Sequence, residues 1–141
     1  KTFPFSMRQG PSERNALGLV KFLFPNKYNI YLHDTPSKSL FSRETRAFSH
    51  GCIRLNDPFD FAYALLAKQE SNPEAFFQNR LKTGSESRVT LTEPVPIHIV
   101  YRTAFTNVTG TLQFRRDVYG RDAAIWNALS QTGVAVRAVQ G

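Results

Sequence analysis

Two helix starts of the same kind stand close together in the middle of the chain. The stretch NDPFDFAYALLAKQ begins with Asn56 or Asp57 as a cap and Pro58 in the first turn, and NPEAFFQNRLKTG repeats this scheme from Asn72 to Gly84. A capping side chain followed by proline is typical of a helix N-terminus. We therefore expect two consecutive short helices, which constrain what the flanking segments can form.

Strand-like patterns flank these helices on both sides. Short runs rich in aromatic and β-branched residues come before them, and from Arg88 onward polar and apolar residues alternate with a period of two. Both patterns are typical of strands. The expected strands lie at 21–25, 27–33, 88–105 and 111–119, with a turn at 107–110 and a last helix at 122–133. The fold class predicted from these elements is α+β and mostly β, with a mixed sheet that carries a site at its strand ends.

Length and charge narrow the kind of protein. The 141 residues suit a single domain, and 18 Lys and Arg against 11 Asp and Glu give a net charge of +7. This charge would suit nucleic acid, an anionic surface or a substrate rich in carboxylates. No apolar run approaches the roughly 18 residues that span a bilayer, and the first residues lack the apolar core of a signal peptide. We expect one compact unit that is a segment of a longer chain.

The single cysteine of the chain, Cys52, lies in the stretch AFSHGCIRLN. It cannot form an internal disulfide, so it is a buried small side chain, an intermolecular partner or a reactive thiol. A thiol becomes a nucleophile when a nearby cation or base favours the thiolate. In an extended segment Cys52, Arg54 and the flanking His50 lie on one side, because side chains alternate. The amides of Gly51 and Cys52 could receive a developing oxyanion.

Two histidines are candidates for the base. His50 is so near in sequence that its ring is directed beside the cysteine, whereas His33, expected at a strand end, can approach from across the site. Catalytic triads are assembled in space rather than along the chain, so we predict His33 as the base. A structural cysteine and a zinc site made by His33, His50 and Cys52 are the alternatives that these residues leave open.

The stretches YLHDTP (31–36) and SHGCIRLN (49–56) together resemble the signature of the L,D-transpeptidase catalytic domain of the YkuD type. That signature is a histidine, a gap, and then Ser-His-Gly-Cys-hydrophobic-Arg. The flanking segments resemble the long-chain branch of the family found in Gram-negative envelopes. The resemblance implies that 1–141 form a catalytic domain with a mixed β-sheet sandwich and short helices after the nucleophile strand. We expect it to be the C-terminal part of that domain, with N-terminal strands missing.

The resemblance implies peptidoglycan chemistry. Cys52 would attack the carbonyl between the third residue of a tetrapeptide stem and its terminal D-alanine, and the amine of another stem would take the thioester to form a 3→3 cross-link. His33 would be the base, its ring oriented by the backbone carbonyl of Asp34. Arg54 would bind substrate. The residues that would shape the pocket or hold the oxyanion are Ser49, His50, Gly51 and Tyr31.

The same resemblance implies partners and a location. The partners would be donor and acceptor stem peptides, with carbapenem β-lactams as inhibitors, and neither nucleic acid nor a metal or other cofactor is expected. The location would be the periplasm or cell envelope, with membrane contact only through regions outside this chain. Two alternatives remain: a papain-like cysteine amidase or endopeptidase of the cell wall, and a non-enzymatic module that binds wall polymer.

Overall fold

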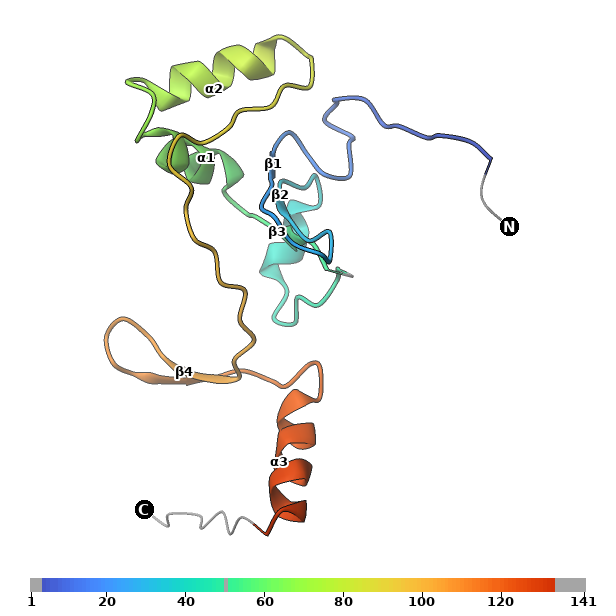
Figure 1. The fold of residues 1–141 in the computed structure, drawn as a ribbon, viewed down its shortest axis with the longest axis vertical. Helices are drawn as coiled ribbons and strands as arrows, with labels where there is room; N and C mark the ends of the chain where they lie inside the picture. Colours follow the sequence, from blue (N-terminus) through green and yellow to red (C-terminus); the bar gives the residue numbers. More distant parts are fainter. Residues whose placement is uncertain (1–3, 50, 134–141) are drawn as a thin grey trace. The chain divides into compact units, whose positions relative to one another are not determined.

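The computed structural model describes residues 4–49 and 51–133 (Figure 1). They divide between two compact units, Lys1–Val95 and Pro96–Gly141. No helix among the described residues is long and apolar enough to cross a membrane. The elements in chain order are β1 (Lys21–Phe22), β2 (Leu32–His33), the 3-10 helix η1 (Lys38–Ser42), β3 (Ile53–Arg54), α1 (Pro58–Leu66), α2 (Pro73–Lys82), β4 (Ala104–Thr106), β5 (Leu112–Phe114) and α3 (Arg121–Gln131).

The first unit contains a three-stranded sheet in the order β1-β2-β3 (Figure 1). β2 lies in the centre, antiparallel to β1 and parallel to β3. The strands are short, but the pairing continues past their ends, since Asp34 N–H donates to Val20 O at 2.9 Å and Leu55 N–H donates to His33 O at 2.9 Å. The sheet therefore holds the two segments that carry His33 and Cys52 next to each other.

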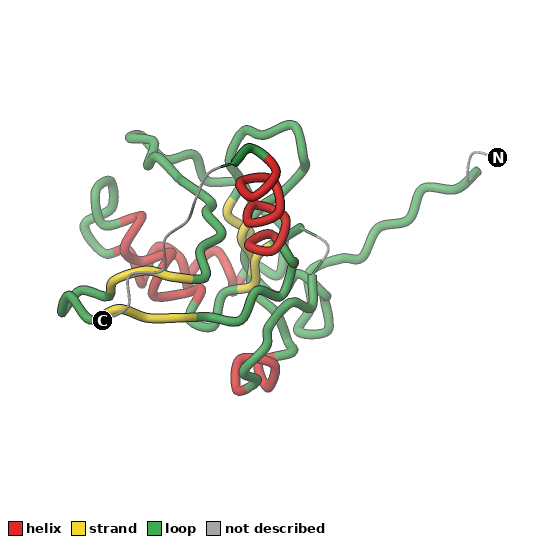
Figure 2. Tube along the Cα trace, turned by 90° about the horizontal axis from the view of Figure 1, so that it is seen from below, coloured by secondary structure: helices red, strands yellow, loops and turns green. Residues whose placement is uncertain are grey.

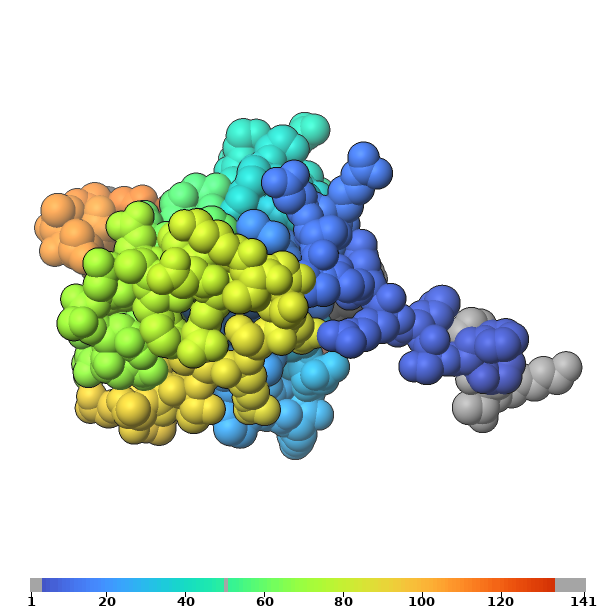
Figure 3. Space-filling view, turned by 90° about the horizontal axis from the view of Figure 1, so that it is seen from above, coloured from blue at the N-terminus to red at the C-terminus, as the bar shows by residue number. Residues whose placement is uncertain are grey.

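The two helices expected in the middle of the chain are confirmed as α1 and α2. Pro58 and Pro73 begin them, and the Asn72 side chain accepts a hydrogen bond from Ala75 N–H at 2.9 Å, as its position as a cap predicts. Ala62 and Leu66 of α1 join Leu32 of β2 in the small buried core. Figure 3 shows the atoms of α2, coloured yellow-green, beside those of the segment that follows it, coloured yellow.

The second unit consists of a hairpin and a helix. β4 and β5 pair antiparallel around the expected turn at 107–110, where the Asn107 side chain accepts from the N–H groups of Thr109 and Thr111. The expected last helix is confirmed as α3. Its first N–H groups, from Arg121 and Asp122, donate to the carboxylate of Asp117 at 3.0 and 2.8 Å. The turn and the helix start are thus both fixed by a side chain that was close in sequence.

The predicted mostly-β sandwich is wrong. The described residues form three α-helices and two small sheets with strands of two or three residues, and loops make up much of the trace (Figure 2). Of the expected strand at 88–105, only its last two residues belong to β4. Pro94 and Pro96 lack the N–H that a sheet ladder needs. Gln69 also bonds the backbone there, accepting from Thr92 N–H at 3.0 Å, so a side chain replaces a neighbouring strand.

Candidate active site

β2 and β3 bring the predicted nucleophile and base together. His33 is the last residue of β2, as expected, and Cys52 directly precedes β3. Ile53 N–H donates to Tyr31 O at 3.0 Å, which continues the parallel pairing to the level of Cys52. Side chains alternate between the two faces of a sheet along each strand. Leu32 and Ile53, which are register partners, therefore lie on one face. The other face carries Tyr31, His33, Cys52 and Arg54.

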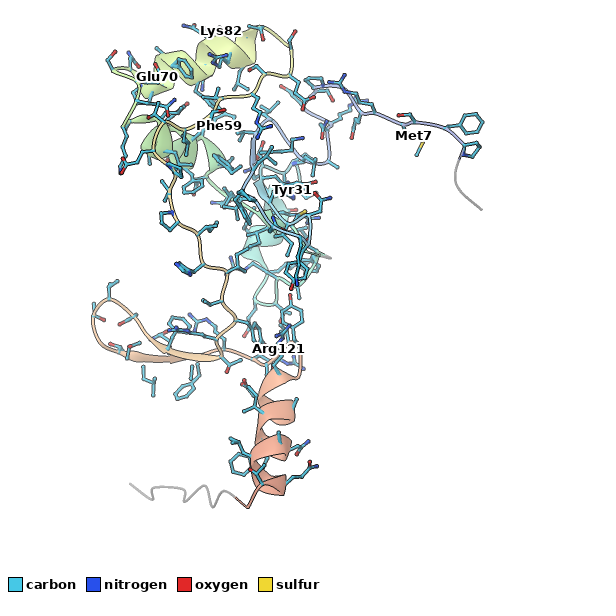
Figure 4. All side chains as sticks on the ribbon, in the orientation of Figure 1. Met7, Tyr31, Phe59, Glu70, Lys82 and Arg121 are labelled. Carbon is cyan, nitrogen blue, oxygen red and sulfur yellow. The ribbon has the colours of Figure 1, made fainter. Side chains whose placement is uncertain are left out.

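Tyr31, labelled in Figure 4, interacts with both predicted reacting groups. Its ring meets the His33 ring edge-on with the centroids 6.0 Å apart, and its hydroxyl interacts with the Cys52 side chain. Burial raises the pKa of Tyr31, and the hydrogen bond with Cys52 and the charge of the thiolate raise it further. The phenol therefore stays protonated and can donate to sulfur or to a charge that develops beside it.

Cys52 is half-buried, is not in a disulfide, and borders a hollow of about 200 Å³. The hollow gives a ligand room beside the sulfur. In this structure Gly51 N–H donates to Ser49 Oγ at 3.3 Å, which is a long hydrogen bond. The residues that line the hollow are Tyr28, Asn29, Ile30, Ser49, Gly51 and Cys52.

His33 is buried, with 5% of its surface exposed, and its Nδ1 lies against the backbone carbonyl of Asp34. A carbonyl oxygen can only accept, so Nδ1 carries the proton in this contact, and in the neutral ring the lone pair is then on Nε2. The ring is thereby held in the tautomer that can accept a proton from a thiol. The carbonyl takes the place that a carboxylate has in a Ser-His-Asp triad.

The Asp34 side chain makes a second set of contacts, which the sequence pattern did not predict. Oδ2 accepts from Leu19 N–H at 3.0 Å, and Oδ1 lies 2.9 Å from Lys38 Nζ. Burial raises the pKa of Asp34, but the hydrogen bonds from Lys38 and from the Leu19 and Thr35 N–H groups outweigh it and lower the pKa below its usual range. The only signal in the sequence was the spacing of four residues between opposite charges.

The remaining predicted site residues differ in how exposed their side chains are. Arg54 is half-buried in β3, where its backbone is the register partner of His33 in β2. Ser49 is exposed at the rim of the hollow. His50 lies outside the described residues. The zinc site that would use His50 as a ligand therefore also lies partly outside them. Among the residues that the structure describes, no three or more His, Cys, Asp or Glu side chains form a group able to hold a metal ion.

This arrangement contains the groups that nucleophilic acyl transfer requires. It has a thiol at the edge of a hollow, a buried imidazole on the same strand face, and a phenol that interacts with both. Cys52 is followed by the strand β3, and the next helix begins only at Pro58. The local chain course is therefore unlike that of a cysteine placed at a helix N-terminus.

Comparison with known proteins agrees with this geometry. The family model of the YkuD L,D-transpeptidase catalytic domain matches residues 1–97. A protein of Haemophilus influenzae named "Putative L,D-transpeptidase" is 35% identical over 127 residues, which are 87% of this chain and 24% of that protein. The chain thus spans about a quarter of the length of this relative. The match includes both stretches that hold Cys52 and His33. The chain belongs to the YkuD family of L,D-transpeptidase catalytic domains.

Proposed function

We propose that this domain forms 3→3 cross-links in peptidoglycan, with Cys52 as nucleophile and His33 as base. The observation that carries the proposal is the parallel register of β2 and β3, which puts both side chains on one face together with Tyr31. Family membership supports the reaction class. The strand that follows Cys52 favours this reading over a papain-like hydrolase, in which the cysteine starts a helix.

The reaction has two halves. His33 Nε2 takes the Sγ proton of Cys52, the thiolate attacks the carbonyl of the donor stem, and D-alanine leaves with the proton from His33. The acceptor amine then attacks the thioester, gives its proton to His33, and releases the Cys52 thiolate. The amides of Gly51 and Cys52 hold the oxyanion, and the substrate oxygen replaces Ser49 Oγ as acceptor of Gly51 N–H. The Tyr31 hydroxyl donates from the opposite strand.

The charge of the chain suits such a substrate. Stem peptides carry free carboxylates, and a net charge of +7 attracts them. Arg54, on the same face as His33, binds a stem carboxylate. Another stem, an envelope protein or a free D-amino acid can each supply the acceptor amine. A relative from a Gram-negative bacterium supports a place in the periplasm or cell envelope.

The test is the intact mass of the purified protein after incubation with a carbapenem, alongside Cys52→Ala. A β-lactam ring opens on the nucleophile, so we expect one adduct of the full drug mass on the unchanged protein and none on the variant. His33→Ala should abolish the adduct and His50→Ala should only slow it. Loss of the adduct in His50→Ala but not in His33→Ala would reverse their roles.

The alternatives give different results in the same experiment. A wall-binding module would show no adduct while retaining salt-dependent binding to isolated cell walls, unchanged by Cys52→Ala. A cell-wall hydrolase would release stem fragments without forming cross-links. Analysis of muropeptides by mass spectrometry, after incubation with tetrapeptide stems, separates both outcomes from transpeptidation.

A further inference from the structure

Lys38 holds three parts of the site with one ammonium group. Its Nζ lies 2.9 Å from Asp34 Oδ1, and it donates to Leu55 O at 3.1 Å and to Asn56 O at 2.6 Å. Two of the three ammonium protons go to these carbonyl oxygens, and the positive charge pairs with the Asp34 carboxylate. The place of Lys38 in the structure is therefore that of a clamp.

The clamp joins the segments that carry the base and the nucleophile. Asp34 follows His33 directly and its backbone carbonyl bonds the His33 ring, while Leu55 and Asn56 follow β3 directly. β2 and β3 contain only two residues each, so few backbone hydrogen bonds fix their relative position. A cation bridging both segments at their carboxyl ends adds the constraint that such a short ladder lacks.

We propose that Lys38 is a positioning residue of the acyl-transfer site, which holds the His33 turn in register with the Cys52 strand. The inference rests on the proposed function, because it takes His33 as the base for Cys52. It concerns the ammonium group of Lys38 and the carboxylate of Asp34, and not the Asp34 carbonyl that contacts the imidazole.

The surroundings of Lys38 distinguish it from an ordinary surface ion pair. Exposed pairs contribute little, because water screens them and long side chains lose entropy. The Asp34 side chain is only 10% exposed and also anchors Leu19 N–H, so its position is fixed from two sides. Lys68 and Glu93 form a pair of the same length, 2.9 Å, but their side chains are 60% and 67% exposed. Lys68→Met is therefore a matched control for Lys38→Met.

The test is a double-mutant cycle on the rate at which iodoacetamide alkylates Cys52. Cys52 is the only cysteine of the chain, so the rate reports this thiol alone and needs no substrate. Misplacement of a catalytic group by about 1 Å can cost about a hundredfold, and we expect Lys38→Met to slow alkylation by at least about tenfold. Lys38→Arg should restore most of the rate, since a guanidinium can still donate to several oxygens, and Lys68→Met should change nothing.

The His33→Ala background separates positioning from general stability. If Lys38 acts through His33, then Lys38→Met has no further effect once His33 is replaced, because the two changes share one pathway. A slowing by Lys38→Met that persists undiminished in the His33→Ala protein would overturn the proposal, as would an unchanged rate in the single variant. Should Lys38→Met not fold, as judged by circular dichroism, the same cycle with Lys38→Gln decides.

Failure of the proposed function has a different signature. A protein that forms no carbapenem adduct and no cross-links can still show the coupling between Lys38 and His33 in alkylation. Conversely, the protein could form cross-links while the effects of Lys38→Met and His33→Ala on the alkylation rate simply add. That result would support the proposed reaction and refute the positioning role of Lys38.

Discussion

Gly18 offers the sharpest test of how the Asp34 carboxylate is held. It has φ +63°, and a Cβ at this position would lie 2.3 Å from Asp34 Oδ2 and 2.4 Å from Asp34 Cγ. Gly84 has nearly the same backbone conformation, φ +65°, but a Cβ there would meet nothing within 4 Å. Gly18→Ala and Gly84→Ala therefore share the cost of the left-handed backbone and differ in the contact with Asp34.

The structure sets the size of each effect. A left-handed conformation costs a non-glycine residue about 1 to 2 kcal/mol, which is the whole expected loss for Gly84→Ala. In Gly18→Ala the Asp34 carboxylate must also move away from Leu19 N–H or Lys38. A hydrogen bond to a charged group contributes about 1.5 to 3 kcal/mol, so the total loss should be about 2.5 to 5 kcal/mol.

Urea unfolding followed by far-ultraviolet circular dichroism measures both variants against the unchanged protein. The quantity of interest is the difference between the two losses in the free energy of unfolding, which should be about 1.5 to 3 kcal/mol. Equal losses, within the roughly 0.5 kcal/mol over which independent changes add, would refute the close packing of Gly18 on Asp34.

Two further predictions concern Asp34 and Tyr31. The folded-state pKa of Asp34 is lowered, so its contribution to stability is present above the unfolded value of about 3.9 and is lost as the pH falls through the folded pKa. Urea unfolding between pH 6 and pH 2 should therefore show a smaller decrease in the free energy of unfolding for Asp34→Asn than for the unchanged protein. An equal decrease in both proteins would contradict the ion pair with Lys38. Tyr31→Phe removes the hydroxyl that interacts with Cys52. Losing one hydrogen bond to the charge that develops during the reaction should slow carbapenem acylation by roughly tenfold or more, without a change in melting temperature. An unchanged acylation rate would show that the hydroxyl takes no part.

Local sequence signals predicted α2, α3 and the hairpin turn because a nearby side chain fixes each of them, whereas α1 begins at Pro58 without a capping hydrogen bond from the Asp57 side chain. Asn72 caps α2 through Ala75 N–H, three residues away, and Asn107 closes the hairpin turn through Thr109 and Thr111. Such contacts lie within one turn of chain, so they are visible as spacings in the sequence. The two short stretches that carry the signature identified the family in the same way.

The extent of the sheets could not be read from alternation alone. Residues 88–103 have a strand-like pattern, but the side chains of Val95, Ile97 and Ile99 are exposed, and within this fully described stretch no residue lies in a strand. A strand exists only when another backbone satisfies its N–H and C=O groups. Pro94 and Pro96 lack the backbone N–H that a strand donates. The Gln69 side chain donates to Thr90 O and accepts from Thr92 N–H, so these backbone groups already have a partner.

The sequence by itself determined the helix starts, the hairpin turn, the choice of Cys52 and His33, and the family. Only the tertiary structure decided that the sheets are small, that Tyr31 interacts with both the thiol and the imidazole, and that Lys38 bridges Asp34 to Leu55 and Asn56. The physical reason is distance along the chain. Caps and turns join residues a few positions apart, whereas strand pairing and the contacts of Lys38 with Leu55 and Asn56 join segments whose proximity exists only after folding.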